Sequence, residues 1–222
     1  MNSSFDLWVA LKNAGYIKKE RDPLWWPRSG TFWVVVGAIL TQQTKWEKVE
    51  QSIENLEKAH IHTLEDIIAM PIESLAMFIQ PSGFYNTKAT NLHLLCHAII
   101  RDFGSFESFC EESDRSWLLA QKGIGEESAD AILCYACLKE HFVVDAYTAR
   151  LLTAFGYEFD SYSALQEWMV EGIVEHFSEI QALDQKQYTL HEVYARFHGK
   201  IVEYCKENSR GKIIMIERLG LS

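Results

Sequence analysis

The sequence predicts an all-α fold built as two helical lobes. Apolar residues recur at helical spacing in the segments between turns, as they do at Ala129, Ile132, Leu133 and Ala136. Glycine and proline residues separate these segments and mark the turns. The chain has 222 residues, 48% of them apolar, which is enough to bury a core in one large or two small domains.

Net charge and cysteine content indicate how strongly the chain binds nucleic acid and in which redox compartment it folds. The formal net charge of -10 predicts modest non-specific affinity for nucleic acid, because phosphate binding usually comes from lysine and arginine. Backbone amides and a few local cations would then anchor such a ligand. Five cysteines at irregular spacing indicate reduced thiols in a cytoplasm. We expect no signal peptide, and no apolar run is long enough to span a bilayer.

The chain begins with a predicted helix and an aromatic loop. The helix covers Phe5 to Tyr16, and the loop follows at 22–27, where prolines flank Trp25 and Trp26. One explanation of adjacent tryptophans in a loop is that they cover the edge of a core, and we expect this of one of the two. The other explanation is a flat wall, since an aromatic face stacks on any nucleobase.

Two helices are expected next, over 31–44 and from Lys45 through Leu56. The first is apolar enough to be buried, and it ends in the polar run Leu40-Thr41-Gln42-Gln43-Thr44. From sequence alone, Gln43 is about equally compatible with a polar helix end that faces solvent and with a site residue. Trp46 follows a polar turn, and its position is equally compatible with a core residue and with a site residue.

Two short helices and then a longer one follow. Pro71 separates the short helices, which cover 63–80. Gly83 permits the next turn, and Asn86 is placed to cap the longer helix over 87–103. Phe84, which follows Gly83, is from composition alone equally compatible with an ordinary loop aromatic tucked inward and with a site residue. We expect Lys88 to be a solvated helix residue or a phosphate contact, and not a catalyst.

Residues 114–140 predict two helices joined by a tight hairpin. The turn is Lys122-Gly123-Ile124-Gly125, because glycine supplies the backbone angles that it needs. The second helix begins at Glu126, and exposed amides at a helix start bind phosphate oxygens. Cys134 and Cys137 have metal-ligand spacing, but their place in an apolar helix without a second pair favours two core thiols.

A single acid follows the hairpin. The apolar run 142–144 leads into Asp145, which is either a catalytic carboxylate or the cap of the helix after it. Further helices are expected over 160–176 and 182–206, returning over the first part of the chain. We assign no chemistry to His198, since such a residue is most often a satisfied surface or core histidine.

These motifs resemble those of the helix-hairpin-helix DNA glycosylase superfamily, the endonuclease III and MutY group. That family's pattern is L-x-x-x-x-G-[IV]-G-x-x-[ST]-A and then V-D-x-x-x-x-R. The matching residues are Leu118, Gly123, Ile124, Gly125, Ser128, Ala129, Val144, Asp145 and Arg150. The stretch 83–89 resembles the family's G-[LF]-Y-N-x-K-A segment. The resemblance implies a two-lobed fold, with one lobe formed by 1–30 and 129–222 and the other by 31–128.

The resemblance also implies a role for each site residue. Asp145 corresponds to the family's catalytic acid. Gln43 would fill the gap left by an extruded nucleotide, and Phe84 would be an apolar wedge that props the duplex open. The residues expected to bind DNA are Gln43, Phe84, Lys122, Gly123, Gly125 and Ser128. The residues expected to form the base pocket are Trp25, Trp26, Pro27, Trp46, Lys200 and Lys206.

Longer motifs are similar to the 3-methyladenine DNA glycosylase III type of epsilon-proteobacteria. They include L-W-W-P, A-I-L-T-Q-x-T-K, P-S-G-F-Y-N and Y-A-R-F-H-G-K-I-V-E. In that type a lysine in the F-H-G-K setting, here Lys200, lies beside the active site and can carry a carbamate. For Lys206 and Lys212 the alternative is a basic tail at a helix C-terminus. One departure is Trp46, where that type has phenylalanine, and the larger ring could narrow the pocket.

Two absences bear on the chemistry. Bifunctional members carry a lysine nucleophile two residues after the second hairpin glycine, and here that position is Glu127. Since a carboxylate cannot form a Schiff base, we expect water as the nucleophile and an abasic site as the product. After Asp145 the chain has one cysteine, Cys205, so it cannot build the four-cysteine iron–sulfur cluster of endonuclease III and MutY.

The resemblance therefore implies a monofunctional DNA glycosylase of base excision repair that flips and releases alkylated purines, 3-methyladenine foremost. Its partner would be double-stranded DNA containing alkylated bases, and it would act as a monomer in the bacterial cytoplasm, associated with the nucleoid. One alternative is a glycosylase for a mismatched pyrimidine or adenine, and another is a non-catalytic helix-hairpin-helix protein that only grips DNA. No metal is expected, and a monovalent cation at the hairpin and a carbamate on Lys200 stay open.

Overall fold

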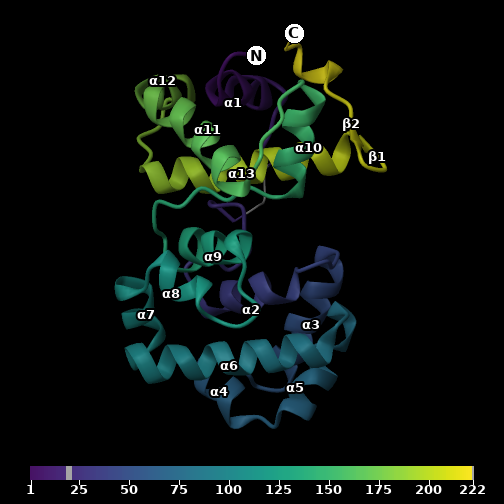
Figure 1. Cartoon of the computed structure of the whole chain (residues 1–222), viewed down its shortest axis with the longest axis vertical. Coiled ribbons are helices and arrows are strands. Elements are labelled where there is room, and N and C mark those ends of the chain that lie inside the picture. Colours follow the sequence, from purple (N-terminus) through teal and green to yellow (C-terminus); the bar gives the residue numbers. More distant parts are fainter. Residues whose placement is uncertain (19–21, 222) are drawn as a thin grey trace. The chain divides into compact units, whose positions relative to one another are not determined.

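The structure, a computed structural model, describes residues 1–18 and 22–221. These residues form two compact units, the first from 1–27 and 139–222 and the second from 28–138, as Figure 1 shows by colour and label. The expected boundary within the hairpin region was earlier, after residue 128. The structure keeps the whole second hairpin helix in the second unit, because that helix packs against α2 (Phe32–Leu40).

Both units are helical, which confirms the predicted fold class. The first unit contains α1 (Ser4–Asn13), α10 (Ala146–Ala154), α11 (Tyr162–Glu175), α12 (Phe177–Asp184), α13 (Leu190–Glu207), β1 (Ser209–Arg210), β2 (Ile213–Ile214) and the 3-10 turn η3 (Glu217–Leu219). The second contains α2, α3 (Trp46–Lys58), α4 (Leu64–Ala69), α5 (Ile72–Phe78), the 3-10 turn η1 (Gln80–Ser82), α6 (Tyr85–Phe103), α7 (Phe106–Glu112), α8 (Arg115–Leu119), α9 (Glu126–Ala131) and the π-helical turn η2 (Ile132–Ala136).

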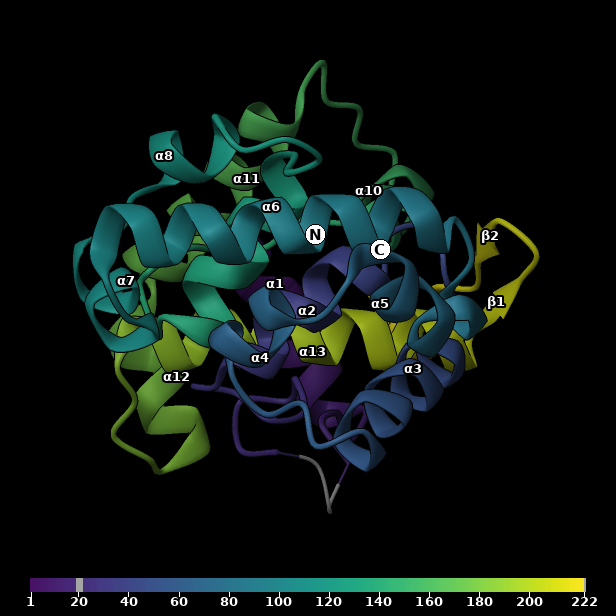
Figure 2. The same ribbon diagram turned by 90° about the horizontal axis from the view of Figure 1, so that it is seen from below.

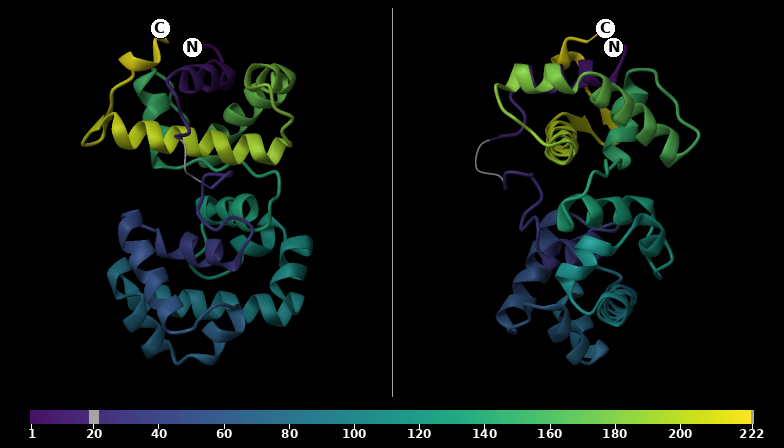
Figure 3. Two further views of the ribbon diagram at one scale, coloured as in Figure 1. Left: turned by 180° about the vertical axis from the view of Figure 1, so that it is seen from behind. Right: turned by 90° about the vertical axis from the view of Figure 1, so that its left-hand side faces the viewer.

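The first unit is organised around α13. This helix is buried along most of its length because it packs against α1 and α10, as the two views of Figure 3 show. The prediction of one helix over 182–206 is wrong. A separate α12 ends at Asp184, because the next residue, Gln185, has a φ of +51° and leaves the helical region. The next helix, α13, starts only after Thr189. Thr189 caps it reciprocally with Glu192: the Glu192 amide donates to Thr189 Oγ1 at 3.2 Å, and the Thr189 amide donates to Glu192 Oε2 at 2.8 Å.

The second unit is organised around α2, in which every residue is buried. The helix ends at Leu40, so the polar residues that follow form a turn instead of the predicted last helical turn. The longest helix, α6, has α4 and α5 packed along it (Figure 2). It begins at Tyr85, with Phe84 as its N-terminal cap residue, so Asn86 lies inside the first turn and the prediction that it caps the helix is wrong.

A short antiparallel pair near the C-terminus was not predicted. Ser209 pairs with Ile214 and Arg210 with Ile213, around a turn at Gly211. Two residues per strand leave the fold class unchanged. In the part of the chain that the structure describes, no helix combines the length and the apolar character required to cross a membrane.

Candidate active site

Asp145 is the N-terminal cap residue of α10. Its Oδ1 accepts hydrogen bonds from the amides of Tyr147 and Thr148, at 2.9 and 2.8 Å, and from the Thr148 hydroxyl at 3.0 Å. The cap interpretation of this acid is therefore confirmed, and the catalytic interpretation stays a prediction. The cap fixes Oδ1 and orients the side chain, and Oδ2 is not one of the cap's acceptors.

His198 faces the second oxygen of Asp145. Its Nε2 lies 3.7 Å from Asp145 Oδ2, and the two side chains are 4% and 13% exposed, respectively. Burial raises the pKa of Asp145, but the hydrogen bond and charge of His198, together with the donors of Thr148, outweigh it and lower the pKa overall. The acid is therefore a carboxylate at neutral pH.

His198 is a buried histidine beside a partner, as expected of a core histidine, but the sequence does not identify that partner. The residue lies on α13, far along the chain from Asp145, and a lone histidine in a helix carries no sequence signal of its partner. Only the packing of α10 on α13 brings the two side chains together.

The aromatic loop adjoins this pair. The Trp25 ring is 5.2 Å from the His198 ring in an edge-on arrangement, and 6.3 Å from the ring of Trp26. Trp26 is buried and covers the core, as expected of one of the two, whereas Trp25 is half-buried. Pro27, the last residue of the loop, is half-buried as well. The structure thus groups Trp25, His198 and Asp145 within the first unit.

Trp25 lies directly on the backbone of α13 at Gly199. A Cβ added at Gly199 would be 2.3 Å from Trp25 Cγ and 2.6 Å from Trp25 Cβ, distances that real contacts do not reach. Trp25 has a φ of +80°, and the Arg196 guanidinium donates to the carbonyl of Pro23 in the same loop at 2.7 Å. The missing side chain of Gly199 is therefore what allows the indole to seat against the helix.

Replacing Gly199 with alanine is expected to lower the free energy of unfolding by about 1–3 kcal/mol, the usual cost of overpacking a tight contact. It should also shift the fluorescence of the displaced Trp25. Urea unfolding and tryptophan emission measure both effects. Gly125→Ser is the control, since an added Cβ meets nothing within 4 Å there, the φ is -98°, and serine is as good as glycine at the N-terminal cap position that Gly125 occupies. Equal stability of the two variants would contradict the steric argument.

The two predicted pocket lysines differ in environment. Lys200 is buried, its Nζ donates to the carbonyl of Tyr16 at 2.6 Å, and it lies 4.7 Å from the centre of the Trp8 ring. Burial lowers its pKa to about 8. Lys206 is exposed in the last turn of α13, where a cation interacts favourably with the helix dipole, in keeping with the basic-tail alternative.

The hairpin in the second unit has the predicted form. Gly123 has a φ of +81°, and an added Cβ would be 2.1 Å from Asn91 Nδ2, so a glycine is required there on both grounds. Lys122, Gly123 and Gly125 are exposed, and Gly125 is the N-terminal cap residue of α9. The side chain of Asn91, which is buried, packs directly against Gly123.

Gln42 braces the hairpin from the end of α2. Its Nε2 donates to the carbonyl of Gly123 and to Ser128 Oγ, both at 3.0 Å. Sequence reasoning singled out the neighbouring Gln43 and missed this residue. Two adjacent glutamines in a turn look alike in a sequence, and only the tertiary contact distinguishes them.

The remaining predicted DNA contacts lie in turns of the second unit. Gln43 is exposed with a φ of +54°. Phe84 is 69% exposed with a φ of +47°, so the inward-tucked alternative is wrong. Trp46, the first residue of α3, is half-buried. Lys88 is only 3% exposed, so the expectation of a solvated lysine or phosphate contact is wrong.

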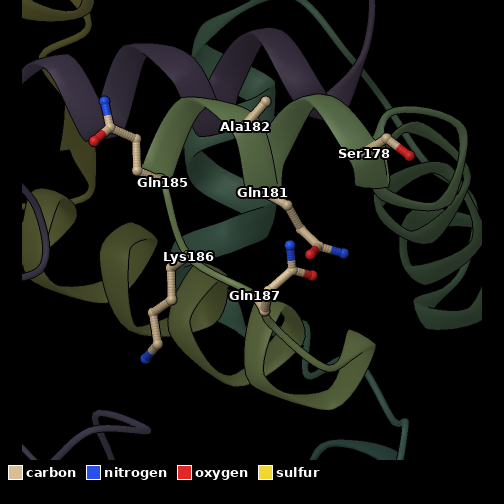
Figure 4. Close-up of a pocket in the computed structure, with 6 residues that line it drawn as sticks. All are labelled: Ser178, Gln181, Ala182, Gln185, Lys186 and Gln187. Carbon is tan, nitrogen blue, oxygen red and sulfur yellow. The ribbon is translucent and has the colours of Figure 1, made fainter.

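Two further features carry no assigned role. A pocket of about 520 Å3 lies on α12 and the turn after it (Figure 4), and it is lined by Ser178, Gln181, Ala182, Gln185, Lys186 and Gln187. Within residues 1–18 and 22–221, no group of three or more His, Cys, Asp or Glu side chains is arranged to hold a metal ion. Cys134 is fully buried, and burial raises the pKa of its thiol, as befits a core cysteine.

Comparison with known proteins identifies the family. Residues 36–168 match the model of the HhH-GPD superfamily base excision DNA repair protein. The Methanocaldococcus jannaschii protein MJ1434, assigned by name to the DNA repair glycosylases, is 35% identical over 196 residues, which are 86% of this chain and 83% of that protein. Endonuclease III of Bacillus subtilis is 28% identical over 128 residues, 58% of this chain and 56% of that enzyme.

A solved structure adds the fold. The H. pylori 3-methyladenine DNA glycosylase (MagIII), crystallised with 1,N6-ethenoadenine, matches with a TM-score of 0.90 and 44% identity, over 94% of this chain and 99% of that one. The family model covers more than half of this chain. The protein therefore belongs to the HhH-GPD superfamily of base excision DNA repair proteins and has the endonuclease III-like fold of its DNA glycosylases.

Proposed function

We propose that the protein is a monofunctional DNA glycosylase that removes alkylated purines, 3-methyladenine foremost, from duplex DNA. One observation carries the proposal: an ionised carboxylate, Asp145, holds one oxygen in a helix cap and turns the other toward a buried histidine beside a half-buried indole. A fixed negative charge next to an aromatic surface is what the release of a cationic purine requires.

The chemistry of the substrate supports this assignment. Methylation of adenine at N3 places a positive charge on the base, so the glycosidic bond is weak and the base leaves as a neutral molecule. Little acid catalysis is needed. The protein must instead stabilise the cationic sugar, and a preorganised carboxylate at Asp145 does so electrostatically. The same carboxylate orients water, accepts its proton as the oxygen bonds to the sugar, and leaves an abasic site.

The base is proposed to stack on the aromatic loop. Trp25 offers an indole held against α13, and stacking is worth about 1–3 kcal/mol per base. Trp26 and Pro27 support this wall in our proposal, and Trp46 is included in the proposed pocket set on the family resemblance alone. An indole at position 46 is expected to accept a narrower range of bases than a smaller ring would.

Lys200 and Lys206 complete the proposed pocket set. Burial lowers the pKa of Lys200 to about 8, which favours the neutral amine, the form that reacts with carbon dioxide. This supports a carbamate on Lys200. The exposed Lys206 is proposed to act only as a local cation.

DNA is proposed to be bound through the hairpin and through two exposed side chains, Gln43 and Phe84, which we call the probes. Lys122, Gly123 and Gly125 are exposed on a turn that Gln42 braces, and Ser128 accepts a hydrogen bond from the same glutamine. The exposed side chains of these two probes are proposed to enter the duplex. A flipped base leaves a gap that a polar side chain can fill and an apolar side chain can hold open.

The proposed reaction uses water and not an amine. Glu127, the second residue of α9, occupies the position at which bifunctional family members carry their lysine nucleophile. Without an amine there is no Schiff base and no strand cleavage. The H. pylori relative supports a pocket for a modified adenine, since its structure holds 1,N6-ethenoadenine.

A base-release assay tests the proposal. The protein is incubated with DNA methylated by an alkylating agent, and the released bases are separated by chromatography. We expect 3-methyladenine in the supernatant, strand breaks only after alkali, and no product trapped by borohydride. Parallel duplexes contain uracil, a mismatched thymine, or adenine opposite oxidised guanine. Release from those duplexes alone would indicate another lesion, and binding without any release would indicate a non-catalytic DNA-binding protein.

A further inference from the structure

Lys88 lies where three segments of the second unit meet. Its Nζ donates to the carbonyl of Leu40 at 2.8 Å, to Thr44 Oγ1 at 2.7 Å and to the carbonyl of Ser82 at 2.8 Å. Burial lowers the pKa of Lys88 to about 8, which leaves the ammonium as the major form at neutral pH. A buried charge persists only when it is fully hydrogen-bonded, and an ammonium has three donors for these three acceptors.

The three acceptors join two turns. Leu40 is the last residue of α2, where a cation interacts favourably with the helix dipole, and Thr44 lies in the turn after it. Ser82 precedes the turn into α6. The Thr44 hydroxyl also lies 2.5 Å from the carbonyl of Ser82, within donating distance, so the turns contact each other directly as well as through Lys88.

Each turn displays one predicted DNA probe in a strained conformation. Gln43 has a φ of +54° and Phe84 a φ of +47°. Residues other than glycine adopt this left-handed region at a cost, and they keep it only where the surrounding structure enforces it. The hydrogen bonds of Lys88 reach the residue after Gln43 and the carbonyl two residues before Phe84. Both strained turns are therefore held from the same buried cation.

We propose that Lys88 is a positioning residue that fastens Gln43 and Phe84 into one rigid element, so that both probes enter the duplex together. A single rigid element loses its conformational entropy when the protein folds, whereas two independent loops would lose theirs when DNA binds, which weakens binding. The roles of the two side chains rest on the proposed function. The fastening itself is a property of the protein without DNA, and it is testable there.

Hydrogen exchange of the unbound protein tests the fastening. Lys88→Met should reduce the protection of peptides covering 41–45 and 82–87 together, by about tenfold or more, because both turns lose a buried hydrogen bond. Thr44→Val removes one hydroxyl and should give a smaller loss in the same two peptides. If Lys88→Met does not fold, Thr44→Val decides alone.

Leu95→Ala is the control for general destabilisation, since Leu95 is a buried residue of α6 that lies two turns beyond Lys88. In Leu95→Ala, the hydrogen-exchange protection of the two peptides should not fall further than the protection of the rest of the second unit. The proposal is overturned if Lys88→Met or Thr44→Val reduces the protection of only one peptide or of neither. It is also overturned if Leu95→Ala reduces the protection of both peptides to the same extent.

A double-mutant cycle tests the consequence for DNA. Affinity for a duplex with an abasic site is measured for Gln43→Ala, Phe84→Ala and the double variant, each with and without Thr44→Val. If the two turns are coupled, the fold-change in Kd for the double variant should differ severalfold from the product of the fold-changes for the two single variants. In the Thr44→Val background, the fold-change for the double variant should lie closer to that product. Additivity in the unmodified protein overturns joint entry. Failure of the base-release assay would overturn the proposed function and leave the exchange result valid.

Discussion

Asp145→Asn is expected to slow the release of 3-methyladenine by about 10²–10³-fold, the range seen when one electrostatic contact to a transition state is removed. Asparagine keeps a carbonyl oxygen for the cap of α10, and it is as good a cap residue as aspartate. What it lacks is the negative charge that, in the proposed mechanism, stabilises the cationic sugar. Single-turnover base release, compared at saturating enzyme, measures the effect on the chemical step.

The affinity of this variant for abasic DNA is the internal control. It should be unchanged, since the charge acts on the departing base and sugar and not on the phosphates. Asp145→Ala removes the cap as well and should cost an additional ~0.5–2 kcal/mol of stability. A full rate in Asp145→Asn would show that another group stabilises the sugar.

The same carboxylate sets a pH dependence. Because its pKa is lowered in the folded protein, the unfolded chain takes up its proton first as the pH falls. The stabilising contribution of Asp145 is therefore complete above the ordinary value of about 3.9 and is lost as the pH drops through the lower, folded value. Across the neutral range, base release should show no acid limb from this residue.

Arg115→Met is expected to lower the free energy of unfolding by about 1–3 kcal/mol, the cost of removing a hydrogen-bond partner from a buried polar group. Arg115 donates to Asp130 through Nε at 2.9 Å and to Glu126 through Nη2 at 3.2 Å, and it thereby ties α8 to α9 across the hairpin. Asp130 is completely buried, so its carboxylate would lose a partner that water cannot replace. Urea unfolding of the whole chain measures the change.

An exposed pair supplies the control for this prediction. Arg101 forms an ion pair with Asp102 at 2.6 Å, but its side chain is 70% exposed. Arg101→Met should therefore change the unfolding midpoint little, since water and salt screen such a pair. Similar midpoints for the two variants would mean that the hairpin does not depend on the Arg115 contact.

Local sequence signals predicted the hairpin turn and the cap at Asp145. The hairpin was predicted because its glycines are required by the turn, and the structure gives Gly123 both a positive φ and a close neighbour, Asn91. Asp145 was predicted by its place after an apolar run, and its cap follows from the same local geometry. Helix boundaries were predicted less well: α12 was missed because no glycine or proline marks the break at Gln185 between it and α13.

Contacts between distant segments were not predictable in the same way. Nothing in the sequence indicates that His198 faces Asp145, that Gln42 rather than its neighbour braces the hairpin, or that Gly199 lacks a side chain for the sake of Trp25. Lys88 is the clearest case, because a lysine near a helix start is usually solvated, and here three carbonyl and hydroxyl oxygens from other segments surround it.

The sequence by itself determined the helical class, the hairpin, the position of the acid and the family pattern, because each depends on residues close together in the chain. The tertiary structure alone decided which lysines are buried, which histidine meets the acid and which glutamine holds the turn. Those outcomes depend on how helices pack, and packing places side chains from remote segments within a few ångströms of one another without leaving a local pattern.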